Sequence, residues 1–194
     1  MGGESRVGVI GAFVGAVALS GVAVADWVVG GVPEGSGAAT AMAIVHAIGY
    51  LLLLPAMVAA RRWLAPSLGR VGRIATTVLV ISLAAMVAGF AGLAIAGEIE
   101  IVALVAGLGF LGMFLGALVL GISAWRRRCT SRLVSGLLVA PLPLLASLAA
   151  LDAVGIVPMH PALMEAAVYL GIATLGSELL STVAARTPRQ TVSA

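Results

Sequence analysis

The amino-acid sequence predicts an all-α, polytopic transmembrane helix bundle with six spans and both termini in the cytoplasm. Composition is the first reason, because 61% of the 194 residues are hydrophobic and only 10% are charged, whereas soluble domains carry about 25% charged residues. The mean hydropathy of +1.17 points the same way. The other reasons are the lengths of the apolar stretches and the places of the arginines between them. The whole chain, residues 1–194, is expected to form one membrane domain.

Each apolar stretch exceeds the roughly 20 residues that a helix needs to cross the hydrocarbon core. Because lipid offers no hydrogen-bond partners to the backbone, stretches of this kind are expected to be helices. The predicted spans cover residues 7–30, 39–60, 74–96, 101–125, 133–157 and 162–185. Residues 186–194 are then a short cytoplasmic tail.

The basic residues set the predicted orientation. All eleven are arginines, and they gather in every second loop and at the two termini. Short loops rich in arginine stay in the cytoplasm during insertion. The clusters are Arg6; Arg61, Arg62, Arg70 and Arg73; Arg126, Arg127, Arg128 and Arg132; and Arg186 and Arg189.

The same arginines suggest a partner and a location. Basic residues at a membrane surface attract anionic lipid head groups, so the expected partner is the bilayer, not nucleic acid. The absence of lysine beside abundant alanine, valine, glycine and arginine is typical of a GC-rich prokaryotic genome, which favours the prokaryotic cytoplasmic membrane. The arginines predicted to contact lipid head groups are Arg61, Arg62, Arg126, Arg127 and Arg128.

The N-terminus allows a second interpretation. Arg6, an apolar run and the sequence Ala23-Val24-Ala25 resemble a signal peptide with its cleavage site. The apolar run of 19 residues is longer than the hydrophobic core of most signal peptides. An uncleaved first span is therefore the prediction, and cleavage would leave five spans.

Small residues indicate where helices approach closely. Helix association in lipid depends on close backbone packing, which glycine and alanine permit. This interpretation favours packing within one bundle, with a homo-oligomer surface as the alternative. The small residues at helical spacing are Gly8, Gly11 and Gly15; Ala88, Gly92 and Ala96; and Gly109, Gly112 and Gly116.

Two prolines interrupt the fifth predicted span. Pro141 and Pro143 each lack an N–H group, so the carbonyls of Leu137 and Val139 lose their helical partners. Such carbonyls must face other helices or a wet cavity. The interruption is either a structural kink or a discontinuous helix that lines a substrate site, as in transporters.

Glu178 is expected to lie inside the apolar part of the sixth span, nearer its cytoplasmic end. An intramembrane carboxylate costs roughly 2.5–3.5 kcal/mol on insertion scales and is a functional hypothesis by default. The functional interpretation is coupling to protons or cations. The alternative is a hydrogen bond to a neighbouring helix, or a contact with arginine at the inner surface.

A second polar group is predicted at the outer end of the bundle. His46 and Tyr50 share one face of the second span, and Glu165 opens the sixth. We expect these residues to converge on an outward-facing pocket. Ligation of a metal or haem by His46 and His160 is the weaker alternative, since their spacing matches no metal signature. The remaining members of the group are Asp26, Asp152 and His160.

Several functions are excluded by missing residues. There is no lysine for a retinal Schiff base, and Cys129 is the only cysteine, so no disulfide forms within the chain. No phosphate loop or HExxH helix occurs. The protein is expected not to be an enzyme and to need no cofactor.

The leading hypothesis is a small integral membrane protein that binds or transports a small solute or ion through the outward-facing pocket. Six spans, cytoplasmic termini and such a pocket resemble the layout of the substrate-binding subunits of energy-coupling-factor transporters. The resemblance lies in the layout and includes no shared motif. The alternatives are an accessory subunit of a larger membrane complex and a membrane redox or lipid-modifying protein.

Overall fold

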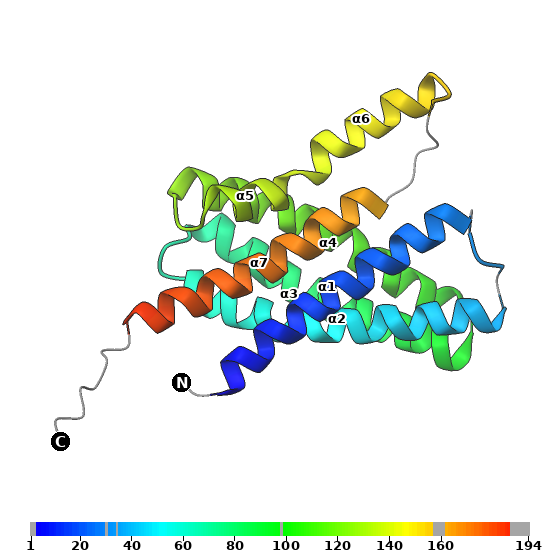
Figure 1. Cartoon of the computed structure of the whole chain (residues 1–194), viewed down its shortest axis with the longest axis horizontal. Helices are drawn as coiled ribbons and strands as arrows, with labels where there is room; N and C mark the ends of the chain where they lie inside the picture. The colour runs from blue at the N-terminus through cyan, green and yellow to red at the C-terminus, as the bar shows by residue number, and fades with distance from the viewer. Residues whose placement is uncertain (1–2, 30, 34, 98, 157–161, 187–194) are drawn as a thin grey trace.

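The computed structural model describes residues 3–29, 31–33, 35–97, 99–156 and 162–186, with side chains except those of residues 3–7, 162–163 and 183–186. Within these ranges the chain forms seven helices and no strand (Figure 1). The all-helical prediction is therefore confirmed. The helices are α1 (Gly3–Val29), α2 (Gly37–Leu64), α3 (Arg70–Ala96), α4 (Glu100–Arg127), α5 (Arg132–Val139), α6 (Pro141–Ala153) and α7 (Ala162–Arg186).

The helices are those of a multi-pass membrane protein. Among the described residues, α1 to α4 are each long and apolar enough to cross a membrane, and α5 with α6 makes a fifth candidate. The outer surface carries many exposed aliphatic side chains, such as Ile81 and Leu104. Helix α7 is not among the candidates, and it carries two carboxylates, Glu165 and Glu178, which lower its hydropathy. The structure thus supports four to five of the six predicted spans.

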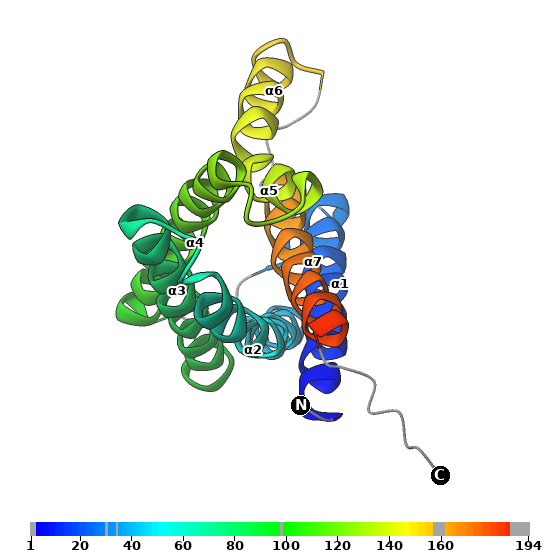
Figure 2. The same ribbon diagram turned by 90° about the vertical axis from the view of Figure 1, so that its left-hand side faces the viewer.

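The helices form a ring (Figure 2). The most extensive contacts join α3 to α4, α2 to α3, α1 to α7 and α1 to α2, and α5 closes the ring between α4 and α7. Because consecutive long helices run in opposite directions, the α2–α3 and α4–α5 loops share one end. We call this the arginine end, since it carries residues 61–73 and 126–132. The α1–α2 and α3–α4 loops share the opposite end.

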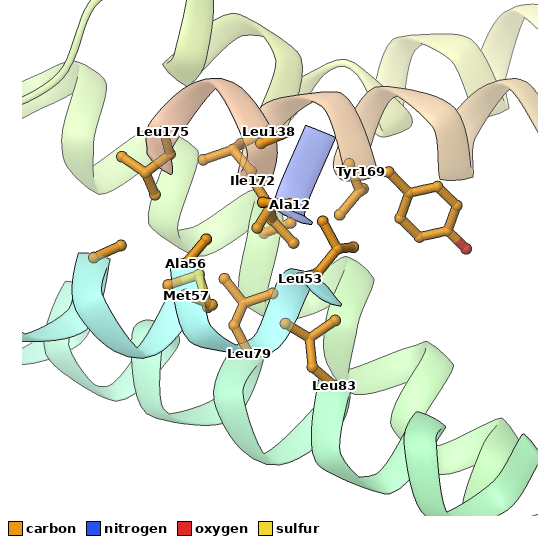
Figure 3. Close-up of a cluster of buried hydrophobic side chains, with 14 of the residues drawn as sticks. Ala12, Leu53, Ala56, Met57, Leu79, Leu83, Leu138, Tyr169, Ile172 and Leu175 are labelled. Atoms are coloured by element: carbon orange, nitrogen blue, oxygen red, sulfur yellow. The ribbon is translucent and has the colours of Figure 1, made fainter. Parts of the chain in front are cut away.

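The core lies where the helices face one another inside the ring. Leu53 and Met57 of α2 pack with Leu79 and Leu83 of α3 and with Ile172 of α7, and all five side chains are buried (Figure 3). Lipid tails are as apolar as these side chains, so the cluster holds α2 against its neighbours through van der Waals packing, not through removal of apolar surface from water. The same cluster sets the depth at which polar groups on α2 and α7 meet.

Glycines allow a close approach of the backbones at two helix crossings. A Cβ atom added to Gly89 of α3 would lie 2.9 Å from the backbone nitrogen of Ala106 of α4, and one added to Gly15 of α1 would lie 2.7 Å from the carbonyl oxygen of Gly49 of α2. The predicted close packing of Gly109, Gly112 and Gly116 on α3 is likewise seen.

Other predicted packing residues behave differently. Gly8 has no atom of the described residues within 4 Å of an added Cβ, and Ala88 and Ala96 are exposed. The predicted Gly92 does meet α4, because a Cβ added there would lie 2.8 Å from Cγ1 of Val102. The second close contact of α3 with α4 is at Gly89, next to the predicted Ala88.

The predicted fifth span, residues 133–157, is not one helix. The chain breaks at Ala140 into α5 and α6, which are bent by 42° relative to each other. Pro141 is the first residue of α6, a position where the missing N–H costs nothing to α6 itself. Beyond the break, α6 projects away from the ring (Figure 2), and only Pro141 and Leu148 of its residues are buried.

Candidate functional site

A cavity of about 400 Å³ lies at the opposite end, between the α1–α2 loop and helices α2 and α3. Among the described residues its polar lining includes Asp26, Thr40 and His46, and its apolar lining includes Phe90 and Leu93. The volume lies within the range of roughly 300–1,000 Å³ that is typical of ligand pockets. A mostly apolar wall with a few polar groups is the usual composition of such a site.

The start of α2 places two of these polar groups. Ser36 is the N-cap of α2, and its Oγ accepts a hydrogen bond from the backbone N–H of Ala39 at 3.1 Å. The cap satisfies one free amide of the first turn. Gly35 precedes it with a φ of +71°, a conformation that glycine adopts without strain. Thr40 Oγ1 donates to the carbonyl oxygen of Ser36 at 3.4 Å, and His46 follows within the next two turns of α2.

The imidazole of His46 is held in a fixed orientation. Its Nδ1 donates to the carbonyl oxygen of Met42 at 2.9 Å, and its ring stacks on Phe90 with centroids 4.6 Å apart and planes 13° apart. Because a carbonyl oxygen can only accept, Nδ1 carries a proton in this bond. In the neutral ring Nε2 is then the acceptor nitrogen.

A buried hydrogen-bond chain lies one helical turn from His46. The ring of Tyr50 lies 6.1 Å from that of His46, and its phenolic oxygen lies 2.6 Å from that of Tyr169 on α7. Tyr169 in turn donates to Glu165 Oε2 at 2.9 Å. The three side chains are 1%, 0% and 7% exposed. The chain therefore links α2 to α7 through groups that water does not reach.

Figure 3 shows Tyr169 at the edge of the apolar cluster, with its phenolic oxygen directed away from it. A carboxylate accepts but does not donate, so Tyr50 donates to Tyr169 when Glu165 is ionised. The order of donation is then Tyr50 to Tyr169 to Glu165.

Glu178 lies at the other end of the molecule. Both of its carboxylate oxygens accept from the backbone N–H of Ser131, at 2.9 and 3.1 Å. Ser131 is the N-cap of α5. Glu178 thus binds the positive end of the α5 dipole, beside the loop that carries Arg126 to Arg128. Of the two interpretations raised by the sequence, this geometry is that of a contact between helices.

The remaining predicted residues are separated from the cavity. Asp152 is exposed near the end of α6, which projects from the ring, and it does not line the cavity. Pro141 and Pro143 lie at the break between α5 and α6. His160 lies outside the described residues. The arginines predicted to bind lipid head groups, Arg61, Arg62, Arg126, Arg127 and Arg128, are exposed at the arginine end.

The part of the chain that the structure describes contains no group of three or more histidine, cysteine or acidic side chains that could hold a metal ion. Two lining residues, Thr40 and Phe90, did not emerge from the sequence. A phenylalanine inside an apolar helix carries no signal that distinguishes a cavity wall from core or lipid contact.

Comparison with protein-family models, with curated proteins and with solved structures finds no match to this chain.

Proposed function

We propose that this protein binds a small solute or ion in the cavity between α1, α2 and α3. The observation that carries the proposal is the joint lining by Asp26, Thr40 and the oriented His46. All three side chains can accept a hydrogen bond, and Asp26 adds negative charge. The preferred solute is therefore a small cation or a donor-rich molecule such as an organic amine.

The arginine loops support the orientation in which this cavity opens outward. If they lie in the cytoplasm, as the positive-inside rule indicates, the cavity faces the other side of a prokaryotic cytoplasmic membrane. The bend at Ala140 would then lie on the inward side of the cavity, and the Tyr50–Tyr169–Glu165 chain beside its entrance. The proposal keeps six spans, with α7 as the sixth.

Thermal unfolding in a neutral detergent tests binding. The probes are sodium, potassium and ammonium ions and a panel of primary and quaternary amines. We expect at least one of them to raise the melting temperature of the natural protein. Asp26→Asn should weaken that binding by roughly tenfold, since a charge-assisted hydrogen bond is replaced by a neutral one.

Asp152→Asn is the matched control, because it makes the same change outside the cavity. The proposal fails if no probe stabilises the protein, or if the two variants weaken binding equally. Uptake of the stabilising probe into proteoliposomes then separates transport from binding alone. A membrane-impermeant maleimide applied to Ser36→Cys and to Cys129, on opposite sides, tests the orientation.

One observation favours a second candidate, an accessory subunit of a membrane complex. Helix α6 exposes apolar side chains along its length, among them Leu142 and Leu151, instead of packing them into the ring. Native mass spectrometry from mild detergent distinguishes the two. A stable homo-oligomer or a co-purifying subunit supports this candidate, and a solute adduct on a monomer supports the first.

A further inference from the structure

A second cavity, of about 520 Å³, lies at the arginine end, around the α4–α5 loop. Three arginines line it, Arg126, Arg128 and Arg132, together with the hydroxyl groups of Thr130, Ser131 and Ser135. Among the described residues the remaining lining residue is Trp125, and the nearby carboxylate of Glu178, which binds the backbone N–H of Ser131, does not line the cavity. It shares no residue with the cavity of the proposed function, and the two lie at different ends of the molecule.

Three of the four arginines in residues 126–132 line the cavity. Arg127 turns elsewhere, because its guanidinium packs against Gly69 in the α2–α3 loop, where an added Cβ would meet Nη2. The neighbours Arg126 and Arg128 line the cavity, and Arg132 reaches it from the first turn of α5. The arginines that line the cavity are therefore brought together by the turn of the chain after α4, and not only by their succession in the sequence.

The conformation of that turn is unusual for an arginine. Arg128 has a φ of +53° and a ψ of +35°, in the left-handed region, where helices usually end on glycine. Its N–H donates to Trp125 O at 3.2 Å, and the N–H of Cys129 donates to Ala124 O at 3.3 Å. These two bonds define a Schellman motif. An arginine at this position accepts backbone strain that glycine would avoid.

The positive charges that line the cavity favour the binding of an anion. Guanidinium groups keep their charge in proteins, and like charges gathered beside a low-dielectric membrane repel one another more strongly than in water. A ligand with negative charge on several oxygens relieves this repulsion and accepts charge-assisted, bidentate hydrogen bonds.

The hydroxyl groups supply further donors. Ser131 Oγ accepts from the N–H of Val134 at 3.3 Å, which leaves its own hydrogen to donate. Thr130 Oγ1 and Ser135 Oγ lie 2.8 Å apart, so one donates to the other and the acceptor retains its hydrogen. The backbone N–H of Ser131 is already bound by Glu178. Side chains would therefore hold the ligand.

We propose that the Arg126, Arg128 and Arg132 cavity binds a phosphate group that carries net negative charge. Arginine forks match the geometry of phosphate oxygens. Trp125 is 53% exposed at the rim, the position that tryptophan takes at a membrane interface. The phosphate belongs either to an anionic lipid head group or to a free phosphate compound.

Two probes distinguish these sources in the full-length protein. Native mass spectrometry measures retention of phosphatidylglycerol against phosphatidylcholine, and added inorganic phosphate serves as competitor. We expect selective retention of phosphatidylglycerol. Loss of two charge-assisted contacts in Arg128→Gln/Arg132→Gln should reduce that affinity by roughly tenfold or more. Competition by inorganic phosphate assigns the site to free phosphate as well, and its absence assigns it to the lipid.

Arg70→Gln/Arg73→Gln is the matched control, because it removes two charges from the same end outside this cavity. Equal loss in both double variants would overturn the proposal, as would binding of neither probe by the natural protein. Arg128→Gly provides a second test that does not endanger folding, since glycine suits the left-handed turn. It should lose affinity for the phosphate probe without a lower melting temperature.

Discussion

The phenolic oxygens of Tyr50 and Tyr169 lie 2.6 Å apart, although 119 residues separate them in the chain. Both rings are buried, and they meet edge to face with planes at 72°. This bond joins α2 to α7 one helical turn from His46, which lines the cavity. The bond therefore ties α7 to the face of α2 that carries His46.

Removal of the Tyr169 hydroxyl should cost more stability than removal of that of Tyr50. Tyr169→Phe takes a partner from Tyr50 and a donor from Glu165, whereas Tyr50→Phe leaves the Tyr169–Glu165 bond intact. Interhelical hydrogen bonds in membranes average about 0.6 kcal/mol, and a buried polar group without its partner costs about 1–3 kcal/mol. We expect a loss of about 0.5 kcal/mol for Tyr50→Phe and about 1–2 kcal/mol for Tyr169→Phe.

Reversible unfolding in mixed detergent micelles measures both losses, and the double variant completes a thermodynamic cycle. The loss in the double variant should fall below the sum of the single losses, because the two hydroxyls share one bond. Additive losses would show that the two tyrosines do not interact.

The glycines at the α3–α4 crossing give a second prediction. Gly89→Ala places a methyl group 2.9 Å from the backbone of Ala106, which side-chain motion does not relieve. Overpacking of this kind costs about 1–3 kcal/mol. Gly107→Ala on α4 is the matched control, since nothing lies within 4 Å of its added Cβ. Alanine in a helix is favoured over glycine by up to about 1 kcal/mol.

The same unfolding measurement should therefore give opposite signs for the two alanine variants. Gly89→Ala lowers stability, and Gly107→Ala leaves it unchanged or raises it. Equal effects would mean that the close approach of α3 and α4 does not depend on Gly89.

The helices could be predicted from the sequence because apolar length and arginine position are local properties. The interruption of the helix at Pro141 could also be predicted from the sequence, since a proline removes a backbone hydrogen bond from any helix interior. The direction in which α6 leaves the ring could not be predicted, because it depends on which helices pack beside α4 and α7. Glu178 illustrates the same limit. Counting residues places it near the cytoplasmic end of the sixth predicted span, but its partner, the N–H of Ser131 in the α4–α5 loop, lies 47 residues away.

Glu178 gives a third prediction, which separates a structural role from a coupling role. Glu178→Gln keeps one oxygen acceptor for the Ser131 N–H, and Glu178→Ala removes both. We expect a loss of about 0.5 kcal/mol for glutamine and about 1–2 kcal/mol for alanine, as for a helix cap. Both values come from thermal unfolding. If glutamine abolishes solute uptake while it preserves stability, Glu178 acts in coupling.

The bend between α5 and α6 gives a fourth prediction. Pro141→Ala/Pro143→Ala restores two backbone N–H groups, which can donate to the carbonyls of Leu137 and Val139. The two helices should then approach one continuous helix, and the end of α6 should move towards the ring. Electron spin resonance between labels at Leu104→Cys on α4 and Leu151→Cys on α6, with Cys129→Ser, should report a shorter distance.

Pro55→Ala is the control for that measurement, because α2 is continuous across Pro55. It should leave the distance between the labels on α4 and α6 unchanged. An unaltered distance in the Pro141→Ala/Pro143→Ala variant would mean that packing, and not the missing hydrogen bonds, holds α6 away.

Cys129, in the loop between α4 and α5, gives a prediction about pH. Burial raises the pKa of its thiol, and the Glu178 carboxylate raises the pKa further, while the Cys129 backbone contact and the Arg127 guanidinium lower it in part. The thiolate is the reactive form, so a raised pKa leaves less of it at neutral pH. Alkylation by iodoacetamide should be slower in the folded than in the unfolded protein. Its rate should still rise with pH above about 8.5, the ordinary thiol pKa.

Shielding of the thiol from the reagent would slow alkylation by a similar factor at every pH, so the midpoint of the pH profile separates the two effects. Glu178→Gln should shift the midpoint to lower pH, because a negative charge that disfavours the thiolate is removed. Arg127→Gln should shift it to higher pH, because a positive charge that favours the thiolate is removed. Midpoints equal to that of the unfolded chain in all three proteins would show that neither burial nor these two charges acts on Cys129.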